Sequence, residues 1–174
     1  MSSTKKLVFA GLCVALGVAL PIAFHSIPNA GSILLPMHIP VLLCGLICGP
    51  VYGLACGALA PLLSSLFTSM PAAAMLPGML CELAVYGLVS GLLIKTVKSG
   101  SKITNIYVSL VGAMLAGRLA GGLVKGLIFQ AGAYSLEMWI TASFVTAIPG
   151  IIAQLALIPL IVLALERAKL IKTA

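Results

Sequence analysis

The sequence predicts an all-α protein: an integral membrane bundle of six transmembrane helices with both termini in the cytoplasm. Three observations lead to this fold class. Hydrophobic residues make up 61% of the 174-residue chain and charged residues 7%, and the mean hydropathy of +1.24 exceeds that of ordinary soluble domains. Most apolar residues fall into runs close to the roughly 20 residues that cross a bilayer as a helix. Eight of the ten Lys and Arg residues lie at the ends of these runs.

The first half of the chain supplies three spans of a single membrane domain that covers residues 1–174. The first apolar run, residues 7–24, follows two lysines. Prolines interrupt the segment 25–38, which we expect to be a loop. A short second span at about 41–48 ends at a Gly-Pro pair, and the third span covers about 51–67.

The second half supplies three longer spans. The fourth covers about 75–94, and the clearly hydrophilic loop KTVKSGSKITN follows it. The fifth span covers about 106–129 and the sixth about 138–165. Pro149 and Pro159 lie within the sixth span, where we expect them to bend or loosen the helix.

The distribution of basic residues predicts the orientation. With six spans, the Lys and Arg residues at the span ends all fall on one side of the membrane, and the loops after the first, third and fifth spans contain none. Positive charge concentrates in cytoplasmic loops, so this side is the cytoplasm. The residues concerned are Lys5, Lys6, Lys95, Lys98, Lys102, Arg167, Lys169 and Lys172.

Glycines recur every fourth residue in several spans. Small residues at this spacing let membrane helices approach closely, so we interpret most of them as packing sites. The pairs and series are Gly45/Gly49/Gly53/Gly57, Gly87/Gly91, Gly117/Gly121 and Gly122/Gly126. A similar stripe in the first span, Gly11, Ala15 and Ala19, has an alternative interpretation as a docking surface for a partner helix.

Three charged residues lie inside predicted spans. Arg118 and Lys125 are seven residues apart and leave the same face of the fifth span. Glu82 lies at a similar depth in the fourth span. A charge in hydrocarbon costs at least about 2.5–3.5 kcal/mol. Glu82 and Arg118 therefore either pair to hold the two spans together, or line an outward-facing cavity that binds a polar ligand, which we favour.

Four further residues are candidates for the ligand site. Tyr86 lies one helical turn from Glu82. His38 enters the second span, where its alternative role is a hydrogen bond within a loop. Trp139 could stack on a flat ligand or anchor the chain at the membrane interface. Gln154 in the sixth span needs a polar partner, whether structural or from a ligand.

Several function classes are excluded by residues that the chain lacks. It shows no catalytic Ser/His/Asp arrangement, acid pair, metal-binding cluster or nucleotide-binding loop, so we expect no enzyme, no metal site and no cofactor within this chain. Basic residues at span ends orient a membrane protein and do not indicate nucleic-acid binding. The five cysteines lie in apolar stretches and are interpreted as small buried side chains.

The whole chain resembles the substrate-binding S components of energy-coupling factor (ECF) vitamin transporters. The best-marked parts are PMHIPVLLCGLICGP and ELAVYGLVSGL, together with the Gly11-Ala15-Ala19 stripe. The resemblance implies a subunit of an ABC-type importer in a prokaryotic cell membrane. Such a subunit captures a water-soluble vitamin or precursor from outside, the loop 25–38 closing over it as a lid. The stripe then docks a membrane coupling protein, and two cytoplasmic ATPases use the ATP.

The nature of the ligand remains open between two groups. Arg118 and Lys125 against the single charge of Glu82 favour an anion such as pantothenate. Glu82 and Tyr86 would equally suit pyridoxine or a hydroxymethylpyrimidine-like ring. The alternative function is an autonomous small carrier driven by an ion gradient, which would need a protonatable relay. Glu82 is the only deep acid available for that role.

Overall fold

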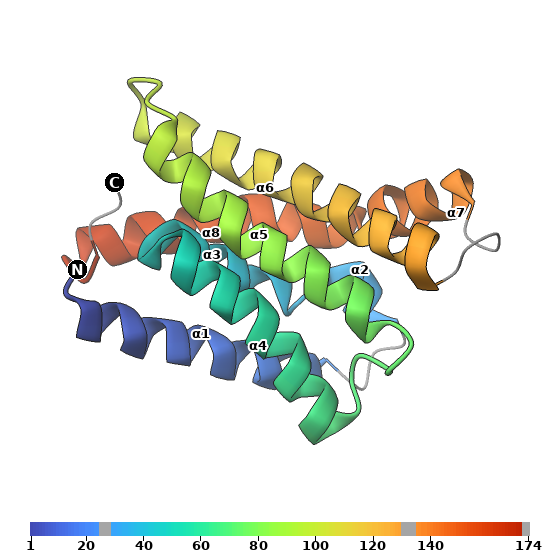
Figure 1. The fold of residues 1–174 in the computed structure, drawn as a ribbon. Helices are drawn as coiled ribbons and strands as arrows, with labels where there is room; N and C mark the ends of the chain where they lie inside the picture. Colours follow the sequence, from blue (N-terminus) through green and yellow to red (C-terminus); the bar gives the residue numbers. More distant parts are fainter. Residues whose placement is uncertain (25–28, 130–134, 172–174) are drawn as a thin grey trace.

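A computed structural model describes residues 1–24, 29–129 and 135–171, and confirms the all-α class with six helices long and apolar enough to cross a membrane. Of the described residues, 83% are helical and none forms a strand. The helices are α1 (Ser3–Ala23), α2 (Ala30–Leu34), α3 (His38–Cys48), α4 (Pro50–Thr68), α5 (Leu76–Thr96), α6 (Lys102–Val124), the π-helix η1 (Lys125–Phe129), α7 (Leu136–Ile140), the π-helix η2 (Thr141–Val145) and α8 (Ile148–Arg167) (Figure 1).

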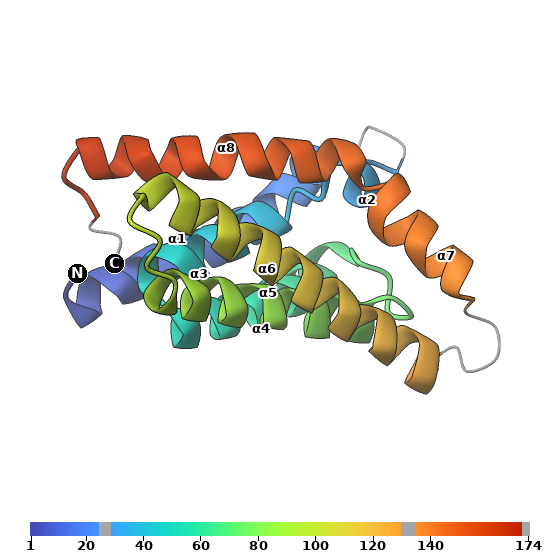
Figure 2. The same cartoon turned by 90° about the horizontal axis from the view of Figure 1, so that it is seen from above.

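Helix α3 is the central element of the bundle. It packs against α1, α4, α5, α6 and α8, and ten of its eleven residues are buried. Viewed from above, α8 lies along one side of the bundle and α4 and α5 lie on the opposite side (Figure 2). The outer helices instead expose large apolar side chains, such as Leu66 on α4 and Leu119 on α6, as lipid-facing helices do.

The segment expected as a loop at 25–38 is partly helical. Residues 25–28 lie outside the described part of the chain, but residues 30–34 form α2, and α3 begins at His38. Asn29 and Leu35, which flank α2, both adopt left-handed backbone conformations with φ of 58° and 50°. Pro40 does not delay α3, because it lies in the first helical turn, where backbone N–H groups have no intrahelical partner.

The sixth span is also less regular than expected. The expected helix at 138–165 is divided into α7, η2 and α8, with a break at Thr146 and Ala147. Pro149 follows as the second residue of α8, where a proline is tolerated. Pro159 lies inside α8 without ending it.

The close glycine contacts predicted from the sequence hold the inner helices together. Gly87 of α5 lies against the backbone of Gly53 in α4, and Gly45 of α3 lies against the carbonyl of Gly87. The backbones of α3, α4 and α5 therefore touch at one point. On α6, Gly117 lies against Tyr86 and Gly121 against Glu82, which fixes the register of α5 and α6.

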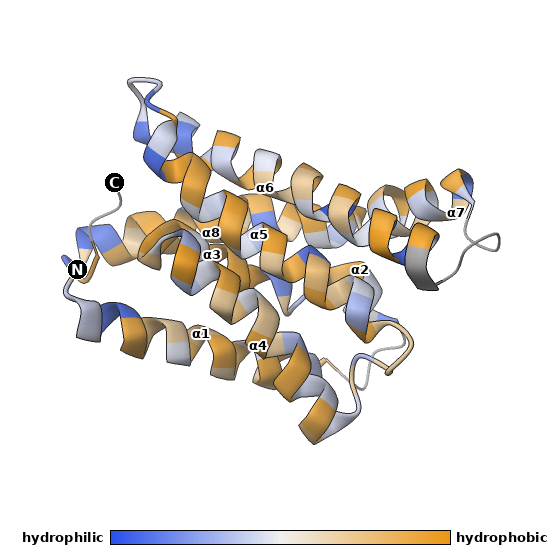
Figure 3. Ribbon diagram, viewed as in Figure 1, coloured by the Kyte–Doolittle hydropathy of each residue, from blue (hydrophilic) through white to orange (hydrophobic). Residues whose placement is uncertain are grey.

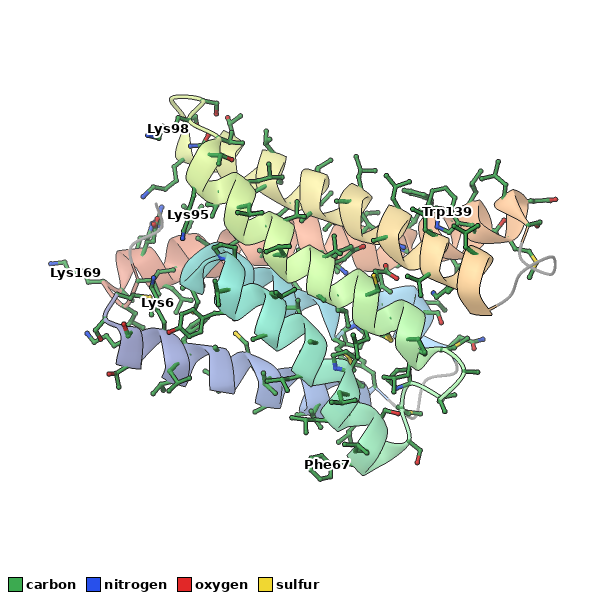
Figure 4. All side chains as sticks on the ribbon, in the orientation of Figure 1. Lys6, Phe67, Lys95, Lys98, Trp139 and Lys169 are labelled. Atoms are coloured by element: carbon green, nitrogen blue, oxygen red, sulfur yellow. The ribbon has the colours of Figure 1, made fainter. Side chains whose placement is uncertain are left out.

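One end of the bundle is rich in lysine. The start of α1 and the end of α8 both lie at this end (Figure 1), and hydrophilic residues concentrate there (Figure 3). Lys6, Lys95, Lys98 and Lys169 also lie there, whereas Trp139 lies near the opposite end (Figure 4). This arrangement agrees with the predicted six-span topology. That the lysine-rich end faces the cytoplasm remains a prediction from the charge rule.

Candidate functional site

The interior contains an unusual group of polar side chains. Four residues from four different helices, α3, α5, α6 and α8, are almost fully buried, with exposed fractions of 0–4%. Within the described part of the chain, seven of their polar atoms have no hydrogen-bond partner. These are His38 Nδ1 and Nε2, Tyr86 Oη, Arg118 Nε and Nη2, and Gln154 Oε1 and Nε2. Buried polar groups normally find partners, so this group is the candidate ligand site.

His38 and Glu82 connect α3 with α5. His38 is the first residue of α3, and its Nε2 lies 3.7 Å from Glu82 Oε1, which is within ion-pair range but too long for a hydrogen bond. Tyr86 lies one turn from Glu82 on α5, and its ring meets the His38 ring edge-on at 5.2 Å between centroids. The sequence-predicted residues His38, Glu82 and Tyr86 are therefore brought together.

The structural alternative, an ion pair between Glu82 and Arg118, is not found among the described residues. Among the described residues, the ion-pair partner of Glu82 within 4.0 Å is His38. Gly117 and Gly121 of α6 both face α5, and Arg118 lies about 100° around the helix from Gly117. His38, which sequence analysis could equally place in a loop, instead reaches Glu82 from α3.

Arg118 faces aromatic residues instead. Its guanidinium carbon lies 5.7 Å from the centroid of the Phe144 ring in η2, a cation–π distance. Its backbone carbonyl accepts a hydrogen bond of 3.2 Å from the indole Nε1 of Trp139. Trp139 in turn meets Phe144 edge-on at 5.5 Å. Phe144 was missed by sequence analysis, because nothing distinguishes this phenylalanine from other apolar residues of its segment.

Lys125 lies nearby but contacts a different helix. It begins η1, and its aliphatic stem covers Gly78 of α5, where an added Cβ would lie 2.6 Å from Lys125 Cγ and Cε. Gly78 is one turn from Glu82 on α5. Arg118 in α6 and Lys125 at the start of η1 therefore contact different neighbours. Gly121, which lies between them in the sequence, packs against Glu82.

Gln154 approaches the site from α8. One turn earlier, Gly150 packs on α2, where an added Cβ would lie 2.7 Å from the carbonyl oxygen of Ile33. Residues four apart share a helix face, so Gln154 lies on the face of α8 that meets α2. Helix α8 also packs against α3, the helix that begins with His38.

Two features of the protein surface lie away from this buried group. Gly11, Ala15 and Ala19 are exposed on α1, and a Cβ added to Gly11 would meet no atom within 4 Å. A hollow of about 230 Å³ lies at the chain ends, lined by Met1, Ser2, Lys5, Lys169, Leu170 and Ile171. We place the candidate site at the buried polar group and not at this hollow, because the unpartnered polar atoms are there.

Comparison with known proteins identifies the family. The family model described as "ECF transporter, substrate-specific component" matches residues 5–162. Comparisons with curated proteins and with solved structures gave no match. The family match includes every residue of the buried polar group. The chain therefore belongs to the family of ECF transporter substrate-specific components, which are membrane-embedded substrate-binding subunits of transporters and not enzymes.

Proposed function

We propose that this protein captures a water-soluble vitamin or vitamin precursor from outside a prokaryotic cell and delivers it across the cytoplasmic membrane. Its family binds small-molecule substrates in complex with ECF coupling and ATPase components. The observation that carries the proposal is that four buried side chains of an otherwise apolar bundle hold seven polar atoms without a hydrogen-bond partner among the described residues. A purely structural bundle has no use for them, since each buried unpaired group costs about 1–3 kcal/mol.

The charges of the site favour an anionic ligand such as pantothenate. Arg118 and Lys125 supply two positive charges and Glu82 one negative charge, and Glu82 already has His38 as its neighbour. The free N–H groups of Arg118 suit a carboxylate. Pyridoxine or a hydroxymethylpyrimidine-like ring is the next candidate, because Glu82, His38 and Tyr86 could bind hydroxyl and ring-nitrogen groups.

The outer surfaces suit the partners that we propose. The exposed small residues of α1, Gly11, Ala15 and Ala19, offer a smooth face to the coupling protein. Two cytoplasmic ATPases would supply the energy, so this chain itself needs no cofactor. The segment 25–38 is the proposed lid, and its helix α2 packs against α8 near Gly150.

Ligand capture can be tested by purifying the protein from cells grown in rich medium and identifying co-purified small molecules by mass spectrometry. The Arg118→Gln variant should lose the compound. Arg167→Gln, which changes the other arginine of the chain at an exposed position on the last turn of α8, should keep it. A compound bound equally by wild type and Arg118→Gln would contradict the assignment of this site.

Energy coupling needs a separate test. Uptake of the identified compound should require co-expression of the coupling protein and both ATPases. Uptake by this chain alone, abolished by a protonophore and by Glu82→Gln, would instead support the ion-gradient carrier. The close approach of His38 to Glu82 at 3.7 Å makes this alternative worth testing.

A further inference from the structure

The short segment 136–145, formed by α7 and η2, contacts both the backbone and the side chain of Arg118. Trp139 in α7 donates its indole N–H to the Arg118 carbonyl at 3.2 Å. Phe144 in η2 places its ring 5.7 Å from the guanidinium carbon. The two rings meet nearly at right angles, at 87°. Backbone and side chain of Arg118 are thus both held by residues five positions apart in the sequence.

The local backbone explains how both rings reach the same arginine. Gly122, one turn from Arg118, makes room for the indole, because an added Cβ there would lie 2.6 Å from Trp139 Cδ1. Residues Thr141–Val145 form a π-helix, whose wider turn brings residues five apart toward one face. π-Helical turns are rare and occur frequently at functional sites.

The rest of this segment contributes little to packing. Leu136 and Met138 are 70% and 53% exposed, and the described contacts of α7 are chiefly with η2. Trp139 is less exposed than both of these neighbours. The described contacts that tie residues 136–145 to α6 are therefore those of Trp139 and Phe144.

We infer that Trp139 and Phe144 are positioning residues, which hold the Arg118 guanidinium ready to bind the carboxylate of the transported ligand. The inference rests on the proposed function. An arginine side chain has many rotamers, and ordering it only when the ligand arrives weakens binding. The cation–π contact with Phe144 uses none of the guanidinium N–H groups in a hydrogen bond, and those on Nε and Nη2 are buried and unpartnered.

This role differs from direct stacking on the ligand. The indole N–H of Trp139 is already donated to Arg118, and its ring lies against Phe144 and Gly122. Trp139 therefore acts on the ligand through Arg118. Replacing it should affect ligands with a carboxylate and leave the binding of matched neutral ligands almost unchanged.

The first experiment observes Arg118 directly and needs no ligand. The chain has two arginines, Arg118 and Arg167, so the protein labelled with ¹⁵N-arginine gives two Nε–H signals in detergent, assigned with Arg167→Lys. We expect Trp139→Phe and Phe144→Leu to shift the Arg118 signal and to raise its exchange with water at least threefold. The exposed control Met138→Leu should leave it unchanged. An Arg118 signal that is the same in wild type, Trp139→Phe and Phe144→Leu overturns the inference.

The second experiment measures specificity by calorimetry with pantothenate and with pantothenol, its neutral alcohol analogue. Immobilising a flexible side chain typically changes affinity about three- to tenfold. Trp139→Phe and Phe144→Leu should therefore each lower the affinity for pantothenate by that factor and the affinity for pantothenol less than twofold. When Arg118→Gln is already present, neither substitution should lower the affinity for pantothenate further. Equal weakening of both probes overturns the carboxylate-positioning role.

The outcomes separate this inference from the proposed function. If the wild-type protein binds neither probe, pantothenate is the wrong ligand, and the NMR experiment alone decides whether Trp139 and Phe144 position Arg118. If one variant does not fold, as judged by circular dichroism and size-exclusion chromatography, the other variant still tests the same contact.

Discussion

Replacing Gly87 with alanine should separate the central helices. Gly87 lies where α5 meets α4, and a Cβ added there would lie 2.9 Å from the Cα of Gly53 and closer still to its carbonyl group. Ordinary contacts of a Cβ begin near 3.4 Å. The neighbour is backbone, which cannot rotate away as a side chain can. The two helices must therefore move apart by roughly half an ångström or more.

The cost can be estimated against a matched control. Gly112→Ala on α6 also adds one methyl group to a helix, but its Cβ would meet only the tip of Leu93, at 2.5 Å from Cδ1, and this side chain can rotate. Both variants gain the same helix propensity of about 1 kcal/mol, so this gain cancels between them. The difference is the overpacking cost at Gly87, about 1–3 kcal/mol.

The assay is thermal unfolding in detergent, followed by circular dichroism. At about 2–4 °C per kcal/mol for a chain of this size, Gly87→Ala should melt roughly 2–12 °C below Gly112→Ala. The displaced α5 also carries Glu82 and Tyr86, so ligand binding should weaken in Gly87→Ala and not in the control. Equal melting temperatures for the two variants would refute the close backbone contact.

Three further predictions concern the ligand, the docking face and the lysine-rich end. Arg118→Gln removes charge-assisted hydrogen bonds worth about 1.5–3 kcal/mol, so affinity for an anionic ligand should fall roughly 10- to 150-fold by calorimetry; an unchanged affinity would exclude contact. Ala15→Leu, at an exposed position of α1, should leave the melting temperature unchanged but abolish co-purification with the coupling protein; retained co-purification would locate docking elsewhere. Lys102→Gln removes an ion pair to Glu166 at 3.1 Å. Because Lys102 is 50% exposed, stability measured by thermal unfolding should change by less than about 1 kcal/mol, and a larger loss would contradict a surface role.

The fold could be predicted largely from the sequence because the bilayer permits few solutions. Apolar length marks each span, and the basic residues between spans predict the topology. Irregular backbone was harder to predict. The π-turns η1 and η2 lie in apolar stretches whose hydropathy does not distinguish them from a straight span. The short helix α2 lies in the proline-interrupted segment that was expected to be a loop. The geometry of these three segments depends on contacts with other helices, such as Gly150 of α8 against Ile33.

The buried polar residues of the candidate site could also be picked out from the sequence, but which of them lie next to each other could not. Buried polar residues stand out in an apolar sequence, so His38, Glu82, Tyr86, Arg118 and Gln154 could all be named in advance. Which of them meet depends on helix rotation and on where a helix begins.

The partner of Glu82 also bears on the choice between a structural pair and a ligand site. Had Glu82 paired with Arg118, the two charges would have offset each other, and little need for a ligand would remain. In the structure His38 is the neighbour of Glu82, and the Arg118 side chain, 4% exposed, has the Phe144 ring as its described contact. A ring face offsets only part of the cost of burying a cation. Under the proposed function, an anionic ligand would offset the rest, and this gain in free energy would be available only when the ligand is bound.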